Sequence, residues 1–281
     1  MKTNEEKLVM LSLLGSIHHP SGGDYYVGHD GIGRILPGVG GITYNYKIGD
    51  TCMGIVGDHV EPCVSLKNTS EKANKALNSF SCVGNSAKVV SGDAKGAYGI
   101  VCGTHGGVEH VFIHFEDEVL EQLSPNDNIL IKGYGQGLRL LDYPNIEVMN
   151  LDPKILNKMH IKEIDGKLWI GVTHIIPACL MGSGLGTSTL KNGDYDIMTH
   201  DITMNKTHHL DTLRFGDIVA IKDHYSPNGP YFLKDACSIG IIVHSDSYSA
   251  GHGPGVCLLL TAKDTSIVPF IDENANLENY L

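Results

Sequence analysis

Three short apolar runs decide the fold class of this chain: Ile218-Val-Ala-Ile-Lys222, Ser238-Ile-Gly-Ile-Ile-Val243 and Val256-Cys-Leu-Leu-Leu260. Each run is rich in branched aliphatic side chains and is bounded by turn-forming residues, which predicts buried β-strands rather than helices. The last two runs are separated by a segment that contains Gly251-His-Gly-Pro-Gly255, and this segment predicts a hairpin loop. The C-terminal part of the chain is therefore expected to form a β-sheet.

The rest of the chain repeats this pattern of turns followed by short strands. Glycine supplies 34 of the 281 residues without a collagen-like period, as expected for many tight turns. Short helices are expected over 70–80, over 116–123 and after Asp152-Pro153, where a capping residue precedes a first-turn proline. The fold class is predicted to be mainly β, a β-rich α+β chain with two β-barrel- or sandwich-like halves and a few short helices.

The stretch 144–166 is the best candidate for a domain boundary, because it holds a proline turn, a short helix and an Asp-Gly turn. We place an N-terminal β-rich domain at 1–160 and a C-terminal β-rich domain at 161–281. A weak internal repeat accompanies this division. In each half a Gly-Asp turn is followed by an Asp-His pair, Asp58-His59 in the first half and Asp223-His224 in the second.

The charge balance excludes one class of partner. The chain carries 21 Lys and Arg against 32 Asp and Glu, a formal net charge of −11. A nucleic-acid partner is not expected, because phosphate binding needs a basic patch and the sequence has none. No apolar run approaches the length that spans a bilayer, so no membrane association is expected either.

The cysteines and the N-terminal segment predict the compartment. The seven cysteines form no Cys-x-x-Cys pair, which favours reduced thiols in a cytoplasmic protein. The apolar stretch Leu8–Leu14 follows two glutamates and lacks a cleavage site, so we expect a helix that is capped near Asn4 and ends at Gly15, not an export signal.

Candidate metal ligands come in pairs spaced by one residue. Side chains at i and i+2 of a strand point the same way about 7 Å apart, close enough to share one ion or substrate. Imidazole and carboxylate ligands together suit Zn²⁺, Mn²⁺ or Fe²⁺. The pairs are His59-x-Glu61, Asp194-x-Asp196 and His244-x-Asp246, and Asp223 lies beside His224.

His252 is a further candidate ligand, because flanking glycines leave its imidazole open to a ligand. The predicted metal ligands are therefore His59, Glu61, Asp223, His244 and His252. In the run 105–114, His110 and His114 alternate with apolar residues and are expected to be exposed or to face a partner.

Two glycine-bounded loops suggest other chemistry. The backbone of Met181-Gly-Ser-Gly-Leu-Gly186 could hold an anion, with Ser183 and Gly184 as substrate-binding residues. Asp93 and Lys95 form a carboxylate–amine pair that is suited to acid–base work. The sequence contains no P-loop and no convincing dinucleotide fingerprint, so no nucleotide cofactor is expected, and it contains neither a Gly-x-Ser-x-Gly elbow nor a His-Glu-x-x-His motif.

Several motifs together resemble one family. They are Leu36-Pro-Gly-Val-Gly-Gly-Ile-Thr-Tyr44, Gly57-Asp-His-Val-Glu-Pro62, Val90-Ser-Gly-Asp-Ala-Lys-Gly96, Met181–Gly186, Gly193-Asp-Tyr-Asp-Ile197 and Val243-His-Ser-Asp246 with the 251–255 loop. From about residue 20 to about residue 265 the chain resembles the prokaryotic family called domain of unknown function 4438. That resemblance supports the β-rich, two-part fold and implies no reaction.

A shorter likeness concerns Gly193–Ile197, Leu213-Arg-Phe-Gly-Asp217 and the glycine-rich histidine loop. This order is similar to the acetamidase/formamidase hydrolases, which are β-rich metal-dependent amide hydrolases. Their Gly-Gly-Asn-x-Asp motif is not intact here. Likeness at this level is an analogy and does not establish function.

Two function classes follow from these motifs. The first is a metal-dependent, amidohydrolase-like enzyme that acts on a small polar substrate, with a divalent ion that activates water. Asp196 or Asp93 would be the general base, Lys95 or the 182–186 backbone would stabilise the oxyanion, and Ser183, Gly184, Asp194 and Tyr44 would bind substrate. The alternative is a non-catalytic, homo-oligomeric protein whose glycine loops bind a small metabolite. A metal-independent isomerase or lyase that uses Asp93 and Lys95 is a third possibility.

Overall fold

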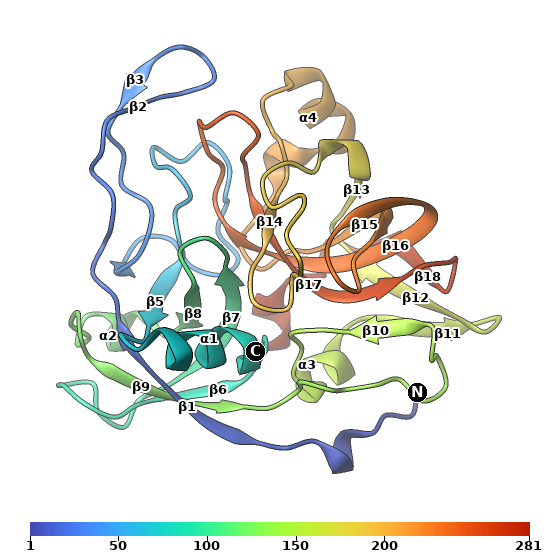
Figure 1. Cartoon of the computed structure of the whole chain (residues 1–281), viewed down its shortest axis with the longest axis horizontal. Helices are drawn as coiled ribbons and strands as arrows, with labels where there is room; N and C mark the ends of the chain where they lie inside the picture. The colour runs from blue at the N-terminus through green and yellow to red at the C-terminus, as the bar shows by residue number, and fades with distance from the viewer.

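The computed structural model describes residues 1–281, and it is built mainly from β-strands arranged in two large sheets that lie side by side (Figure 1). The predicted mainly β fold class is confirmed. None of the helices is both long and apolar enough to cross a lipid bilayer.

The first sheet closes on itself into a six-stranded barrel, because β1 (Leu11–Ile17) also pairs with β5 (Cys63–Lys67). A short seventh strand, β4 (Ile42–Thr43), pairs with β5 at the edge. Sixteen buried apolar residues fill the interior. Around the barrel the strands are β1 (Leu11–Ile17), β9 (Asn128–Gly133), β6 (Ser86–Val89), β7 (Tyr98–His105), β8 (His110–His114) and β5 (Cys63–Lys67).

The second sheet contains the three apolar runs that were quoted from the sequence. They form β15 (Ile218–Tyr225), β16 (Tyr231–His244) and β17 (Gly255–Ala262), which pair as antiparallel neighbours. The sheet is completed by β10 (Ile146–Val148), β13 (His174–Pro177) and β14 (Tyr195–Asp196).

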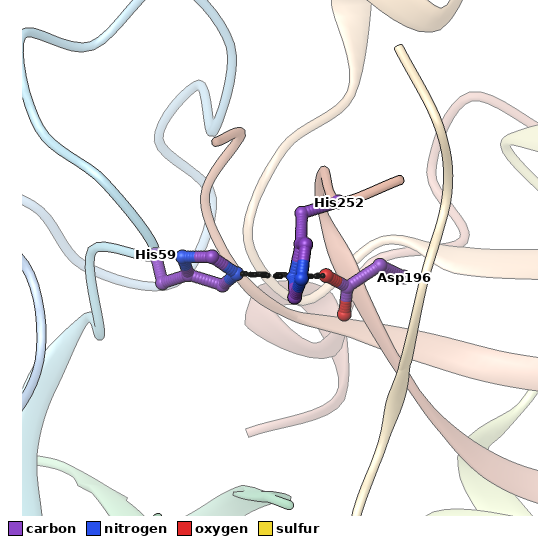
Figure 2. Close-up of side chains that lie close together, drawn as sticks. All are labelled: His59, Asp196 and His252. Carbon is purple, nitrogen blue, oxygen red and sulfur yellow. Dashed lines mark hydrogen bonds and ion pairs between the residues drawn. The ribbon is translucent and has the colours of Figure 1, made fainter. Parts of the chain in front are cut away.

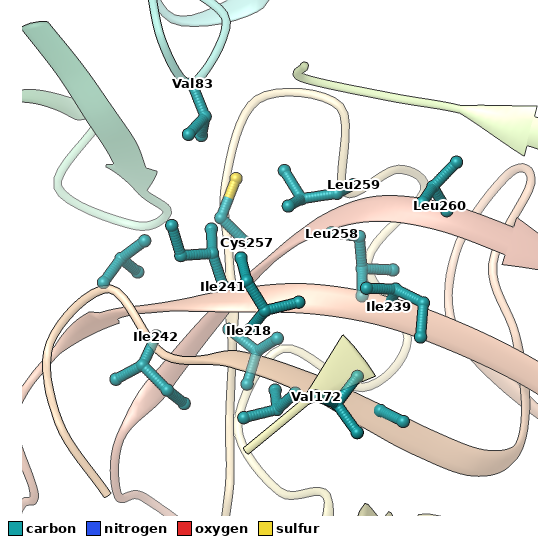
Figure 3. Packing of buried hydrophobic residues seen from close by; sticks show 14 of the residues in the cluster. Val83, Val172, Ile218, Ile239, Ile241, Ile242, Cys257, Leu258, Leu259 and Leu260 are labelled. Carbon is teal, nitrogen blue, oxygen red and sulfur yellow. The ribbon is translucent and has the colours of Figure 1, made fainter. Parts of the chain in front are cut away.

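A third, three-stranded sheet packs against the second. It consists of β11 (Ile161–Ile164), β12 (Lys167–Val172) and β18 (Ile267–Ile271). Its Val172 lies beside residues of β15 and β16 in the shared apolar core (Figure 3). A separate two-stranded hairpin of β2 (Tyr26–Val27) and β3 (Gly33–Arg34) projects away from the sheets (Figure 1).

The helices are short and lie in connections between strands. The predicted helix over 70–80 is confirmed as α1 (Glu71–Phe80), and α3 (Pro153–Lys158) begins after Asp152, whose side chain accepts from the Lys154 N–H. The helix expected over 116–123 is confined to α2 (Asp117–Leu120). The other helices are α4 (Ile202–His208) and the 3₁₀ turns η1 (Glu5–Lys7), η2 (Ala178–Leu180), η3 (Leu210–Thr212) and η4 (Leu277–Tyr280).

The N-terminal helix expected over Leu8–Leu14 is wrong. The segment is a single 3₁₀ turn followed by strand β1, in which Leu13 and Ile17 are buried and Leu11 and Leu14 are exposed. A short apolar run fits a strand as well as a helix, and here pairing with β9 and β5 decides between them.

The two copies of the internal repeat share the structure of their Gly-Asp turns but not of the segments that follow. Asp50 accepts from the Lys47 N–H as Asp217 accepts from the Arg214 N–H, and the two turns pair with one another between Thr51 and Arg214. After the turns the copies diverge, because Asp217 leads directly into β15 whereas the segment from Asp50 to Asp58 forms no continuous strand.

The two large sheets share one seam. β7 of the barrel packs against β16 and β17, and a Cβ atom at Gly103 would overlap the side chain of Val243. The Thr104 hydroxyl also lies 3.7 Å from the Cys257 sulfur across the seam. Strand ends and loops from both sheets therefore meet here.

The core of the second sheet should respond strongly to truncation. Leu258 is fully buried among other aliphatic side chains (Figure 3). We expect Leu258→Ala to lower the free energy of unfolding by about 2–5 kcal/mol, because a cavity remains. Urea unfolding followed by circular dichroism measures this change. The exposed Val56→Ala is the control, with an expected change within about 0.5 kcal/mol, and equal effects of the two substitutions would contradict the packing.

A buried histidine predicts acid sensitivity. His224 lies beside the Ser238 hydroxyl at 2.7 Å, and burial lowers its pKa to about 4. Between pH about 6.5 and about 4, His224 is protonated in the unfolded chain but stays neutral in the folded chain. Its contribution to stability is therefore lost as the pH falls through this range.

We therefore expect the wild-type protein to lose about 3 kcal/mol more stability than His224→Gln between pH 7 and pH 4, measured by urea unfolding at both values. Equal losses in the two proteins would show that His224 is not held neutral by the fold.

Candidate functional site

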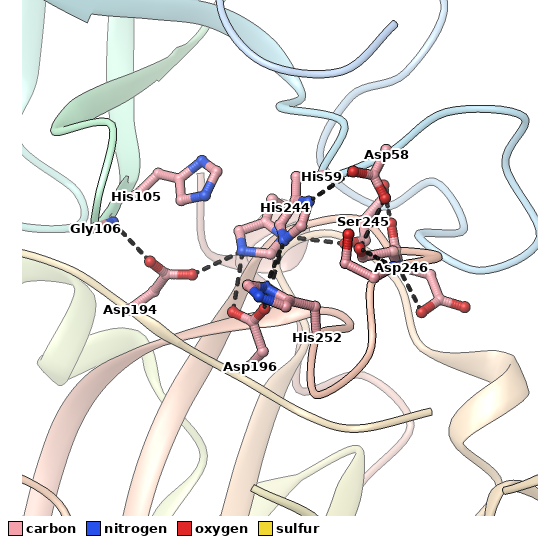
Figure 4. Close-up of polar contacts among 12 residues, drawn as sticks. Asp58, His59, His105, Gly106, Asp194, Asp196, His244, Ser245, Asp246 and His252 are labelled. Carbon is pink, nitrogen blue, oxygen red and sulfur yellow. Dashed lines mark hydrogen bonds and ion pairs between the residues drawn. The ribbon is translucent and has the colours of Figure 1, made fainter. Parts of the chain in front are cut away.

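Six histidine and aspartate side chains converge at the seam between the two sheets (Figure 4). They come from segments that are far apart in sequence. The loop before β5 supplies His59, the end of β7 supplies His105, and β14 with the residue before it supplies Asp194 and Asp196. The end of β16 supplies His244, and the loop between β16 and β17 supplies His252.

One group of three is His59, Asp196 and His252 (Figure 2). The Nε2 atom of His59 lies 3.0 Å from Nδ1 of His252, which in turn lies 2.9 Å from Oδ2 of Asp196. The same Asp196 oxygen is 3.5 Å from Nε2 of His59. Three potential ligand atoms therefore face one point.

The second group of three is His105, Asp194 and His244, all of them buried. Nε2 of His244 lies 2.8 Å from Oδ2 of Asp194, yet neither atom makes a hydrogen bond of acceptable geometry. The other oxygen of Asp194 accepts from the Gly106 N–H at 2.7 Å, which fixes the carboxylate. Two buried polar atoms are thus left side by side without a hydrogen-bond partner.

Outer contacts orient three of the imidazoles. Nδ1 of His59 lies 3.2 Å from the Asp58 carboxylate, and Nδ1 of His105 lies 2.6 Å from Glu61. Nδ1 of His244 donates to the backbone carbonyl of Ser245 at 2.9 Å. A histidine that donates from Nδ1 keeps the lone pair on Nε2, which is the usual arrangement of a metal-ligating histidine.

The His59 loop is held in place by the opposite half of the chain. The Val60 N–H donates to the Ser245 hydroxyl, and the Ser245 N–H donates to the Val60 carbonyl. His59 itself has a φ of 53°, an unusual backbone conformation for a non-glycine residue. Such conformations persist where the surroundings enforce them, and they are common at functional sites.

The electrostatics of the group are those of tightly paired opposite charges. Burial alone would raise the pKa of Asp196, but the neighbouring imidazoles of His244, His252 and His59 lower it well below its usual range. Burial alone would lower the pKa of His244, but the nearby Asp194 and Asp196 raise it well above its usual range. Asp196 therefore stays ionised, and its charge can balance either protons on the histidines or a bound cation.

The donor set fits a divalent transition metal. Imidazole nitrogen and carboxylate oxygen bind Zn²⁺ at about 2.0–2.2 Å, so neighbouring ligand atoms on one ion lie about 3 Å apart. All three separations in the first group and the His244–Asp194 separation in the second, 2.8–3.5 Å, agree with this spacing. Gly255 leaves room for the second group, because a Cβ atom at this position would overlap both Asp194 and His244.

A cleft of about 430 Å³ opens onto these side chains, a size that is typical of small-molecule sites. Ser183 and Gly184 line it, as do Gly106 and Gly107 from the β7–β8 turn. The backbone N–H groups of Gly107 and Gly184 donate to no acceptor within the chain. They are available to a bound ligand.

Family models match almost the whole chain. The N-terminal domain model of domain of unknown function DUF4438 matches residues 25–157, and its C-terminal domain model matches residues 158–281. The chain belongs to the DUF4438 family. It is also similar to a solved structure, the crystal structure of TM1086, with 46% identity, a TM-score of 0.96, and coverage of 100% of this chain and 99% of that one. No curated protein matches the chain. None of these matches is to acetamidase or formamidase, so that likeness rests on the short motifs alone.

In this DUF4438 chain the structure brings together most of the predicted site residues. His59, His244 and His252 lie with Asp194 and Asp196 in the six-residue cluster. Ser183 and Gly184 line the adjoining cleft. Asp196, which was predicted to be a general base, lies within ligand distance of the histidines instead.

Glu61 belongs to the surroundings of the cluster and not to the cluster itself. Its buried carboxylate accepts from His105, His110, the Gly40 N–H and the Ser65 hydroxyl. Both oxygens are occupied, so Glu61 orients His105 and has no free lone pair directed at the cleft. Burial alone would raise its pKa, but the hydrogen bonds with His105 and His110 lower it well below its usual range.

Four predicted residues lie elsewhere. Asp223 accepts from the Asp235 N–H near the opposite end of β16 from His244, which removes it from the ligand set. Asp93 and Lys95 are exposed in the loop before β7, at the opposite end of that strand from His105. Tyr44 is 57% exposed and does not line the cleft.

Sequence reasoning missed His105 and misplaced His110. His110 was expected to be exposed, but it is buried because it pairs with His105 across the β7–β8 hairpin and both bind Glu61. The available signal was a histidine followed by two glycines, His105-Gly-Gly107, at a strand end. Asp246, the partner of His244 in a predicted pair, binds the Ser247 N–H and lies outside the cluster.

The orienting role of Glu61 can be measured. We expect Glu61→Gln to weaken Zn²⁺ binding by about 10–100-fold, because His105 loses the carboxylate that fixes its ring. Isothermal titration calorimetry of metal-free protein gives the affinity. The matched control is Glu109→Gln, which changes an exposed glutamate in the β7–β8 hairpin that carries His105. Equal affinities in the two variants would contradict this role.

Proposed function

We propose that this protein is a metal-dependent hydrolase that acts on a small, polar, amide-like substrate in the cleft at the seam. One observation carries the proposal. The buried atoms Nε2 of His244 and Oδ2 of Asp194 lie 2.8 Å apart without a hydrogen-bond partner, next to a cleft. Buried polar atoms are rarely left without a hydrogen bond, so a metal ion that both atoms bind is the simplest explanation.

The alternative explanation of these side chains is a structural network of ion pairs. Such a network normally satisfies its polar atoms by hydrogen bonds and is closed to solvent. Here five of the six residues line an open cleft, and the side chain of His252 is 34% exposed. The outer contacts of His59, His105 and His244 engage Nδ1 of each ring and not Nε2, which favours metal binding through Nε2.

Attack by a metal-bound water is favoured over attack by a side-chain nucleophile. Cys63, four residues after His59, is buried, and burial raises the pKa of its thiol to about 12. No serine lies within a nucleophile elbow motif. A bound divalent metal ion supplies the missing chemistry, because it lowers the pKa of a coordinated water toward neutrality.

The lining of the cleft favours a neutral substrate with a carbonyl group. No lysine or arginine lines it, which disfavours a phosphate or another strongly anionic substrate. The free N–H groups of Gly107 and Gly184 can donate to a substrate oxygen as charge develops on it. The Ser183 hydroxyl is a further polar contact at the rim.

A non-catalytic metabolite-binding protein is the second candidate. Both cleft carboxylates, Asp194 and Asp196, lie within the ligand groups, so no separate carboxylate remains to act as a general base. In this case the protein, as a cytoplasmic homo-oligomer, would bind a small metabolite without converting it.

The decisive experiment is ammonia release from a panel of small carboxamides, with metal-free protein and with protein loaded with Zn²⁺, Mn²⁺ or Fe²⁺. We expect turnover only in a loaded form. His252→Ala should reduce turnover more than about 100-fold, which exceeds the effect of removing only an outer contact. His160→Ala, an exposed histidine far along the chain from the cluster, is the control and should retain activity.

Thermal-shift measurements on the same panel separate the two candidates. A ligand that raises the melting temperature and is recovered unchanged supports the binding protein, whereas a ligand that is consumed supports the hydrolase. A folded protein that takes up none of the three metals would overturn the hydrolase proposal.

A further inference from the structure

We infer that the cleft holds two metal ions rather than one, and that the Asp196 carboxylate bridges them. The inference takes its chemistry from the proposed function of the same cleft, but it can be tested by metal content alone. The first ion would bind His59, His252 and one oxygen of Asp196. The second would bind His105, His244, Asp194 and the other oxygen of Asp196.

The position of Asp196 is the first argument. Its Oδ2 atom lies 2.9 Å from His252 and 3.5 Å from His59, whereas its Oδ1 atom lies 3.5 Å from Nε2 of His244 (Figure 4). The two oxygens of one carboxylate therefore face different histidine groups. A bridging carboxylate has this arrangement in sites where two metals lie about 3.5–4 Å apart.

The number of ligands is the second argument. A single octahedral ion bound by all six side chains would have no position left for water or substrate, and catalytic sites keep such a position open. Two ions with three or four protein ligands each keep open positions on both. The Asp194 atom without a hydrogen-bond partner belongs to the second group, so the first group alone does not account for it.

Charge is the third argument. Four carboxylates contact the cluster histidines directly, namely Asp58, Glu61, Asp194 and Asp196. No lysine or arginine lines the cleft to balance them. Imidazoles that ligate a metal are neutral, so four negative charges in a largely buried place match two divalent cations, whereas with one cation the other two charges would have to be balanced by protons on the remaining histidines.

Two ions would also extend the chemistry of the cleft. They would provide separate positions for the attacking water and for the substrate carbonyl. Gly107 and Gly184, whose N–H groups have no acceptor within the chain, line the same cleft. The substrate class that follows is a small carbonyl compound that can reach both positions at once.

The test is the metal content of full-length protein titrated with Mn²⁺ or Zn²⁺ and freed of excess metal. We expect two equivalents per chain in the wild type, and one equivalent each in His252→Ala and His244→Ala, because each variant loses one ligand group. His160→Ala should keep two. A value of one or none in the wild type overturns the inference, as does loss of both equivalents in a variant that circular dichroism shows to be folded.

A second measurement needs no variant. Electron paramagnetic resonance of the Mn²⁺-loaded wild type should show an exchange-coupled pair, because a carboxylate bridge holds the ions close together, and signals of isolated ions alone would overturn the inference. Two equivalents without turnover of any carboxamide would leave the two-metal site standing and contradict the hydrolase. One equivalent with turnover would support the hydrolase and contradict the two-metal site.

Discussion

The buried carboxylate of Glu61 is the interaction on which the site depends. It accepts hydrogen bonds from two histidines of the β7–β8 hairpin, from the Gly40 N–H and from the Ser65 hydroxyl. A fully buried charge is stable only when such contacts replace its hydration. By satisfying that requirement, Glu61 joins the loop before β4, the strand β5 and the hairpin, and it directs His105 toward the cleft.

The seam between the two sheets supplies the rest of the site. The loop that carries His59 pairs with Ser245 at the end of β16, so the first half of the chain is fixed to the second where their ligands meet. Asp196 lies opposite Gly255 in the β14–β17 pairing, and only glycine leaves room there for Asp194 and His244. Neither half contains a complete ligand group, because each group takes histidines from both.

Much of the architecture and part of the site could be predicted from the sequence. Aliphatic runs bounded by turns identified β15, β16 and β17, and the Asp152-Pro153 signal identified α3. The one-residue spacing of Asp194 and Asp196 correctly placed both carboxylates on one side of a strand. His252 was recognisable from another local pattern, since flanking glycines leave a polar side chain exposed. The segment Leu8–Leu14 was not predictable, because short apolar runs suit either secondary structure until strand pairing decides.

The sequence by itself determined the elements and the residue types near the cleft, because strand periodicity, capping and turn chemistry are local properties. Tertiary structure decided which histidines meet. His105 and His244 are 139 positions apart in the chain, yet their rings lie 4.3 Å apart because β7 packs against β16. The same long-range packing separated Asp223 from His244, although both lie in neighbouring strands, and it buried His110 against Glu61. Contacts of this kind depend on the register and packing of strands that are distant in sequence, and no local pattern encodes them.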